Sequence, residues 1–154
     1  MLSWVLKHLK RLGGQTTPGA STANQQIIFL HGSDELGVDV LGVSQHQQII
    51  HQAYSIVGES APGEHLATLI LNTENLEKNP EINVALNDNI IGRCPAPFSN
   101  NYVSWLQKWN LLESTVWCKA IIIRRQNLNK EGEYIYSVRL AIEQPFKMTT
   151  LQTR

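Results

Sequence analysis

The sequence predicts a mainly β domain of the α+β kind, a small antiparallel barrel or sandwich with one principal helix. Two observations support this prediction. After residue 26 the chain consists of short runs rich in β-branched and aromatic residues, which turn-forming residues separate. One stretch, 99–112, instead repeats its large apolar residues at helical spacing. The predicted strands are 27–31, 36–43, 52–59, 64–71, 81–86, 89–93, 116–125 and 133–143.

Two of the connections between these strands predict hairpins. The last two strands are joined by residues 126–132, whose sequence QNLNKEG is rich in turn formers, and large residues such as Tyr134 and Tyr136 alternate along the returning strand. The earlier pair is separated only by Asn87 and Asp88. Because both residue types tolerate positive φ, we expect a tight turn there.

The predicted helix at 99–112 has a clear apolar face. Trp105 and Trp109 lie four residues apart on that face, and Ser99 is available as an N-cap. We therefore expect the helix to plug or cap the barrel, with both tryptophans facing the core.

The first 25 residues predict an amphipathic helix followed by a flexible linker. In residues 2–12 the apolar positions share one helical face and the basic residues lie mainly on the other, while the linker is rich in Gly, Pro, Ser and Thr. Such a helix suits an anionic membrane surface or a groove on a protein partner, and it equally suits packing on its own domain. The predicted organisation is this tail (1–25), a barrel domain (26–146) and a C-terminal tail (147–154).

Composition narrows the class of protein. The chain has 154 residues, typical of one domain, and its 13 basic residues balance 13 acidic ones, so it lacks the overall positive charge of many nucleic-acid binders. No run approaches the length needed to span a bilayer. The sequence has two cysteines, Cys94 and Cys118, and no secretory signal, so we expect buried reduced thiols and a cytoplasmic location.

The motifs of common enzymes are incomplete. The runs FLHG (29–32) and GVSQH (42–46) suggest an α/β hydrolase, but the second glycine of the nucleophile elbow is missing. His46 and His51 are five residues apart, so a helix would not bring both imidazoles to one metal ion. No phosphate-binding loop is present. We therefore expect no catalysis, no metal and no cofactor.

Charge is distributed unevenly along the domain. Residues 55–89 carry six acidic side chains and one basic one, whereas residues 90–154 carry nine basic and four acidic side chains. The basic half also holds most of the aromatic residues. On a small barrel, basic groups bind the phosphates of a single strand. Exposed aromatic rings stack on its unpaired bases, and each stacked base contributes about 1–3 kcal/mol. This half of the chain is therefore the candidate nucleic-acid surface.

An ordered set of short motifs runs through residues 53–143. The motifs are Val57-Gly58, Asn75 in an acidic loop, the strand 82–86, Ile91-Gly92, and a helix ending in Trp105-Leu106. In this order they resemble the HIRAN domain family, and specifically a small stand-alone bacterial or phage-type member. The resemblance implies a small β barrel related to OB and SH3-like folds. HIRAN domains occur in DNA-repair helicases and in bacterial proteins, and the best understood examples grip the 3′ end of single-stranded DNA.

Several positions depart from the family pattern. Glu77 and Lys78 stand where the family has a Tyr-Asp pair, and Glu59 and Ser60 stand where it has basic or aromatic residues. A carboxylate facing a phosphate lowers affinity, since the two charges repel each other. Among these motif positions only Arg93 is suited to bind phosphate.

The sequence thus predicts a non-catalytic module that binds single-stranded DNA. The alternative is a protein-interaction or membrane-docking adaptor whose DNA pocket is lost. Adjacent Arg124 and Arg125 point to opposite faces of a strand, so we expect one of them to join the binding surface. The predicted contacts are Arg93, Lys119, Arg124 and Arg125 for phosphates, and Phe98 or Tyr102 for stacking.

Overall fold

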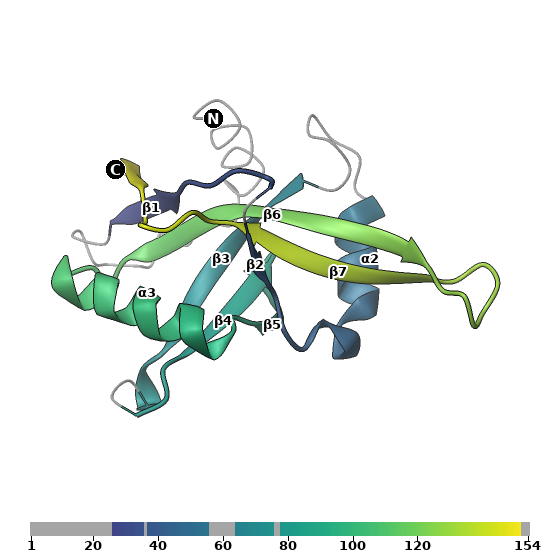
Figure 1. Cartoon of the computed structure of the whole chain (residues 1–154), viewed down its shortest axis with the longest axis horizontal. Helices are drawn as coiled ribbons and strands as arrows, with labels where there is room; N and C mark the ends of the chain where they lie inside the picture. The colour runs from purple at the N-terminus through teal and green to yellow at the C-terminus, as the bar shows by residue number, and fades with distance from the viewer. Residues whose placement is uncertain (1–25, 36, 56–63, 76–77, 152–154) are drawn as a thin grey trace.

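The structure is a computed structural model that describes residues 26–35, 37–55, 64–75 and 78–151. Its β-rich architecture, in which a curled sheet forms a half-barrel, confirms the predicted fold class (Figure 1). The predicted N-terminal helix and linker lie outside the described residues. In chain order the elements are β1 (Ile27–Leu30), β2 (Val38–Asp39), the 3-10 turn η2 (Val43–Gln45), α2 (Gln47–Ser55), β3 (Glu64–Asn72), the 3-10 turn η3 (Thr73–Asn75), β4 (Glu81–Leu86), β5 (Asn89–Arg93), α3 (Ala96–Lys108), β6 (Thr115–Gln126), β7 (Tyr134–Ala141) and β8 (Met148–Leu151).

The main path of the sheet runs β2-β7-β6-β3-β4-β5, and every neighbouring pair on it is antiparallel. Its two ends meet through a backbone bridge just after β2. The Leu41 N–H donates to the Arg93 carbonyl at 2.8 Å, and the Arg93 N–H donates to the Leu41 carbonyl at 2.9 Å. β1 departs from the antiparallel pattern, because it runs parallel to the start of β6 and carries β8 on its other edge.

Gly92 makes this closure possible. A Cβ added to Gly92 would lie 2.3 Å from the Leu41 carbonyl oxygen and 2.7 Å from Cγ1 of Val40. Both distances are shorter than any real Cβ contact, so a side chain here would push the two ends of the sheet apart. The glycine is required for space, since its φ lies outside the left-handed region.

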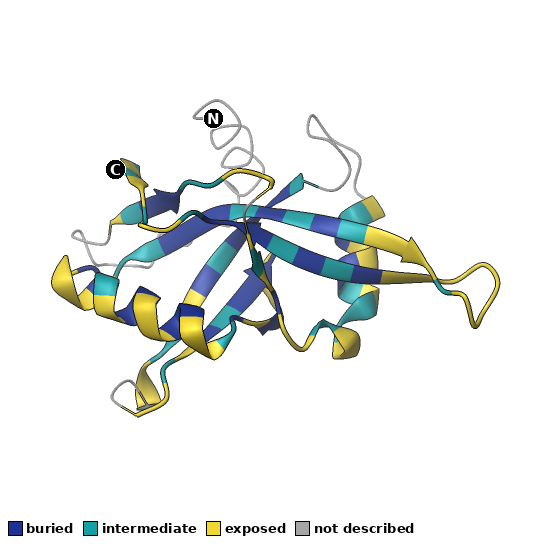
Figure 2. Ribbon diagram, in the orientation of Figure 1, coloured by how far each residue is buried: buried dark blue, intermediate teal, exposed yellow. Residues whose placement is uncertain are grey.

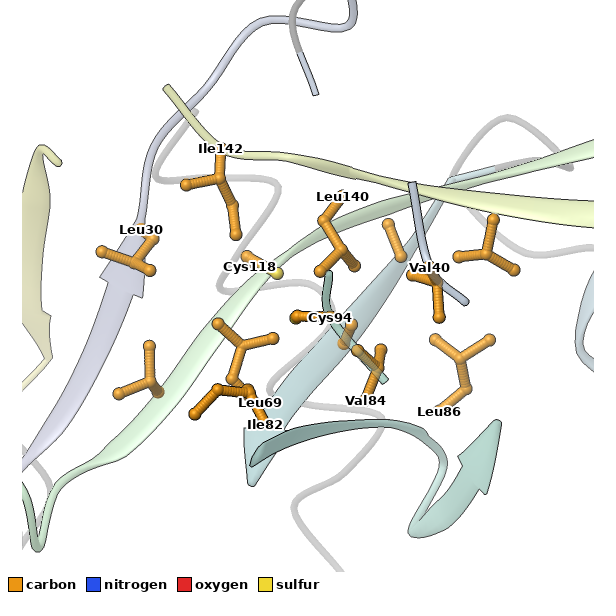
Figure 3. Packing of buried hydrophobic residues seen from close by; sticks show 14 of the residues in the cluster. Leu30, Val40, Leu69, Ile82, Val84, Leu86, Cys94, Cys118, Leu140 and Ile142 are labelled. Atoms are coloured by element: carbon orange, nitrogen blue, oxygen red, sulfur yellow. The ribbon is translucent and has the colours of Figure 1, made fainter. Parts of the chain in front are cut away.

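The core lies inside the curl of the sheet. Alternate residues of the central strands point inward, and α2 and α3 add apolar side chains from their buried faces. Cys94 and Cys118 are buried there and form no disulfide, which confirms that part of the cysteine prediction. Figure 3 shows ten labelled members of this cluster: Leu30, Val40, Leu69, Ile82, Val84, Leu86, Cys94, Cys118, Leu140 and Ile142.

A second apolar cluster lies on the other face of the sheet. It consists of Phe29 from β1, Leu66 from β3 and Trp117 from β6, with the half-buried Ile27 and Leu151 beside them. Their strand neighbours Leu30, Ala67 and Cys118 belong to the main core. Because side chains alternate along a strand, the second cluster must point away from the core.

The strand predicted at 52–59 is wrong. Residues 52–55 belong to α2, and residues 56–59 lie outside the described part of the chain. Ile50 and Ala53 are the buried residues of this helix, with Ile49 and Tyr54 packed beside them. This helical spacing of three and four residues begins before residue 52, so the sequence of residues 52–59 by itself does not show it.

The predicted helix at 99–112 exists but is shifted toward the N-terminus. α3 begins at Ala96 after Pro95, and the buried Ser99 hydroxyl donates to the Pro95 carbonyl at 3.1 Å instead of capping the helix. Trp105 packs against the core, but Trp109 follows the last helical residue and is 56% exposed. The prediction that both tryptophans face the core is therefore wrong for Trp109.

Both predicted hairpins are confirmed. Asn87 and Asp88 have φ of 49° and 67° in the turn between β4 and β5. The β6–β7 hairpin projects from the end of the molecule opposite α3, and its tip is exposed (Figures 1 and 2). Two boundaries differ from the prediction: the strand expected at 36–43 is reduced to β2 and the bridge at Leu41, and the C-terminal tail contains β8.

Replacing Gly92 with alanine tests the closure of the sheet. We expect Gly92→Ala to lower the free energy of unfolding by about 3 kcal/mol, because a backbone carbonyl cannot move aside as a flexible side chain can. Gly132→Ala is the control, since its added Cβ meets nothing within 4 Å and only its φ of 83° is strained. That strain costs about 1 kcal/mol. Urea unfolding measures the free energy of unfolding of both variants. Equal losses would show that the close approach of Gly92 to Leu41 is not needed for the stability of the sheet.

Candidate nucleic-acid interface

Phe98 and Tyr102, the two rings predicted to stack on bases, are buried in the core. They are 4% and 1% exposed, and their rings stack on each other with centroids 5.6 Å apart. Phe146 packs edge-on against both. Neither ring can reach a base without unfolding this part of the core, so the stacking role predicted for them does not fit the structure.

Lys119 is neutralised by two carboxylates. Its Nζ lies 2.9 Å from Oδ1 of Asp34 and 3.0 Å from Oε1 of Glu64, and its side chain is only 15% exposed. Burial by itself would lower the pKa of Lys119, but hydrogen bonds to the two carboxylates outweigh it and raise the pKa overall. The charge is therefore satisfied within the protein, and Lys119 is a poor phosphate ligand.

Arg93 is exposed at the end of β5, where the two ends of the sheet meet. Its Nη1 lies 3.0 Å from the place that a Cβ on Gly42 would occupy, so its guanidinium lies beside the start of η2. In the structure the space beside Gly92 is filled by Leu41 of the same chain.

Arg124 forms the clearest cationic feature of the described surface. Its guanidinium carbon lies 4.3 Å from the ring centroid of Tyr134 and 4.9 Å from that of Tyr54. We call these three residues the tyrosine–arginine stack. Arg124 is exposed and Tyr134 is 46% exposed, so the stack is open to solvent. Arg125, paired with Ile135, points to the opposite face of the hairpin.

The stack joins β6, β7 and α2, and Gln47 fixes the position of α2. The Gln47 side-chain amide donates to the Tyr136 carbonyl at 2.9 Å, and its oxygen accepts from the Tyr136 N–H at 2.8 Å. It thus takes the place of a neighbouring strand at the edge of β7. Tyr136 also hydrogen-bonds to Nδ1 of His51, and its ring lies 5.6 Å from that of Tyr54.

The segment that places Tyr54 beside Arg124 contains no acidic residue. Residues 40–55, which include η2 and α2, contain no Asp or Glu. Asp39, just before them, is held by Arg139 through a contact of 3.3 Å to Nε. α2 touches both β5 and β7, so this acid-free segment extends between the strand that carries Arg93 and the strand that carries Tyr134.

Among the described residues, no cluster of three or more His, Cys, Asp or Glu side chains could hold a metal ion. Burial raises the pKa of Cys94 to about 12 and also raises the pKa of Cys118 well above its usual range, so both thiols stay protonated and are poor metal ligands. A surface groove of about 220 Å³ at the end of β3 has Glu113 among its lining residues, and no His, Lys or Cys of the described chain lines it.

Sequence reasoning missed Tyr54 and Gln47 as functional residues. Tyr54 fell within the wrongly predicted strand, and Gln47 has no local signal because its two bonds reach a strand 89 residues away. The predicted arginine pair, by contrast, lies on the hairpin as expected, and the register distinguishes its two members.

Comparison with protein families, with characterised proteins and with solved structures finds no match for this chain. The resemblance to HIRAN domains therefore stays a prediction from the sequence. Three of the family positions that depart from the pattern, Glu59, Ser60 and Glu77, lie outside the described residues, as does the Val57-Gly58 pair. None of the helices that the structure describes is long and apolar enough to cross a membrane.

Replacing Gln47 with alanine tests the anchoring of α2. Gln47→Ala leaves the Tyr136 N–H and carbonyl without these partners, so we expect a loss of about 2 kcal/mol in the free energy of unfolding. The exposed neighbour Gln48 provides the control, and Gln48→Ala should change stability by less than about 0.5 kcal/mol. Thermal unfolding of both variants measures the difference. Equal stabilities would mean that water replaces the amide without cost.

Proposed function

We propose that this protein is a non-catalytic module that binds single-stranded nucleic acid, as its resemblance to HIRAN domains implies. The tyrosine–arginine stack carries the proposal. Two rings lie close to the Arg124 guanidinium, Tyr134 from β7 and Tyr54 from α2. No carboxylate among the described residues pairs with it. Its N–H groups can therefore donate to a phosphate, whose oxygens match the planar guanidinium fork.

A single strand also offers unpaired bases, and Tyr134 supplies a ring for them. Tyr134 is 46% exposed and is the first residue of β7. Stacking of one base on an aromatic ring contributes about 1–3 kcal/mol and tolerates any base. The stack thus combines the two interactions that proteins use to bind single strands without sequence preference.

The acid-free segment of η2 and α2 gives the strand a path away from the stack. α2 has nine residues and is about 14 Å long at 1.5 Å per residue. Tyr54 of the stack lies near its C-terminal end, and Arg93 lies beside Gly42, just before η2. We propose that phosphates bind at Arg124 and Arg93 and that the polar side chains of α2 lie between them. The buried free thiols are typical of a reducing compartment, so we propose a cytoplasmic location.

The arginine pair provides a matched test of this proposal. Binding of fluorescent single-stranded DNA is measured by anisotropy between about 50 and 200 mM salt, where phosphate contacts make log K fall with log salt. Arg124→Ala should weaken binding and reduce the salt slope by about 0.7, the value for one phosphate contact on a single strand. Arg125→Ala, which removes the same charge from the opposite face, should leave the slope unchanged.

Further variants and a second ligand test the other parts of the proposal. Tyr134→Phe should bind as the wild type does, because the ring is kept, whereas Tyr134→Ala should lose about 1–3 kcal/mol at every salt concentration. Oligonucleotides with free and blocked 3′ ends test the part that rests on HIRAN domains, for which a blocked end should weaken binding. If the wild type does not bind at about 50 mM salt, where phosphate contacts are strong, the nucleic-acid proposal is wrong.

A protein-interaction module is the second candidate, and the opposite face of the hairpin favours it. Leu128 at the tip is 96% exposed and Ile135 is 50% exposed, next to Arg125. Exposed apolar side chains beside an arginine are typical of protein-binding surfaces. This function is favoured over the first if the protein does not bind single strands and if its affinity for a protein partner does not change with salt concentration.

A further inference from the structure

The second apolar cluster occupies a face of the sheet that neither described helix covers. Phe29, Leu66 and Trp117 are 1%, 7% and 8% exposed, and the partly buried residues packed with them, Ile27 and Leu151, also come from strands. No residue of α2 or α3 belongs to the cluster, because both helices pack into the main core. A Phe and a Trp each bring about 150–250 Å² of surface, so this face is a large apolar area for one side of a sheet.

The cluster has polar borders that limit what can lie over it. Lys119, two residues after Trp117 on the same face, is bound to Asp34 and Glu64. On the other side Phe29 pairs with Thr149, whose hydroxyl contacts the His31 ring. A segment that covers the cluster therefore needs one apolar face toward the sheet and polar residues elsewhere, as an amphipathic helix has. A segment that is apolar on every side would bury the charged groups at the border.

We propose that residues 2–12 of this chain cover the second cluster. Their apolar residues Leu2, Val5, Leu6, Leu9 and Leu12 share one helical face. Lys7 and Arg11 lie opposite that face, so they would stay in water when the apolar face is buried. Eleven helical residues are about 16 Å long, a span of three to four neighbouring strands.

The point where the described chain begins supports this occupant. The Thr115 N–H donates to the Gln26 carbonyl at 2.9 Å, directly before Ile27 and Phe29 of the cluster. The chain before Gln26 is therefore joined at the edge of the cluster, and the 13 residues that separate it from residue 12 would have a typical span of about 20 Å if they form the linker predicted from the sequence. So short a tether gives an effective concentration in the millimolar range. An isolated helix of this length is marginal in water, so docking would also stabilise it.

The test compares two double variants in the full chain. Leu6→Gln with Leu9→Gln removes apolar contacts, and Lys7→Gln with Arg11→Gln changes the opposite face as a matched control. A soluble paramagnetic agent broadens the indole resonances of exposed tryptophans in NMR spectra. We expect broadening of Trp117 to increase several-fold in the leucine variant, toward that of the exposed Trp109, and to stay at the wild-type level in the control.

Other outcomes would overturn the proposal. If Trp117 is equally protected in both double variants, residues 2–12 do not cover the cluster. If the leucine variant instead loses binding to phosphatidylglycerol vesicles while Trp117 stays protected, the segment is a membrane anchor. A measurement on the wild type avoids any effect of substitution on folding: nuclear Overhauser contacts should connect the Trp117 ring to the methyl groups of Leu6 or Leu9, and their absence would contradict the proposal.

Discussion

The backbone bridge between Leu41 and Arg93 is the constraint on which the arrangement of the described surface depends. It joins the ends of a curled sheet, and it forms only because Gly92 has no side chain to meet the Leu41 carbonyl. The chain passes from this bridge directly into η2 and α2, so the bridge fixes where α2 begins. Gln47 then holds α2 against the edge of β7, and this placement brings Tyr54 over Arg124.

The parts of the fold that follow from local chemistry could be predicted from the sequence. Asn87 and Asp88 adopt positive φ in a tight turn, and the alternation along β7 matches the returning strand predicted for the last hairpin. α2 was missed because its buried face has only Ile50 and Ala53 fully inside, among polar residues. The closure at Leu41 and the edge bonds of Gln47 join distant segments, so no local pattern could reveal them.

The candidate site shows the same division. Alternation along β6 predicted that only one of two adjacent arginines joins the surface, but choosing Arg124 required knowing that α2 packs on its side of the hairpin. Phe98 and Tyr102 lie on the buried face of α3, and aromatic content alone cannot distinguish a core ring from a stacking platform. Lys119 has the right charge, but its two carboxylate partners become neighbours only in the folded sheet.

Titration of single-stranded DNA into isotope-labelled protein, followed by NMR, tests the central claim most directly, because it locates the bound strand without any substitution. We predict that the side-chain resonances of Tyr54, Arg124 and Tyr134 shift together, with smaller changes along the exposed side of α2. Shifts confined to Arg125 and Ile135 on the opposite face of the hairpin would contradict it.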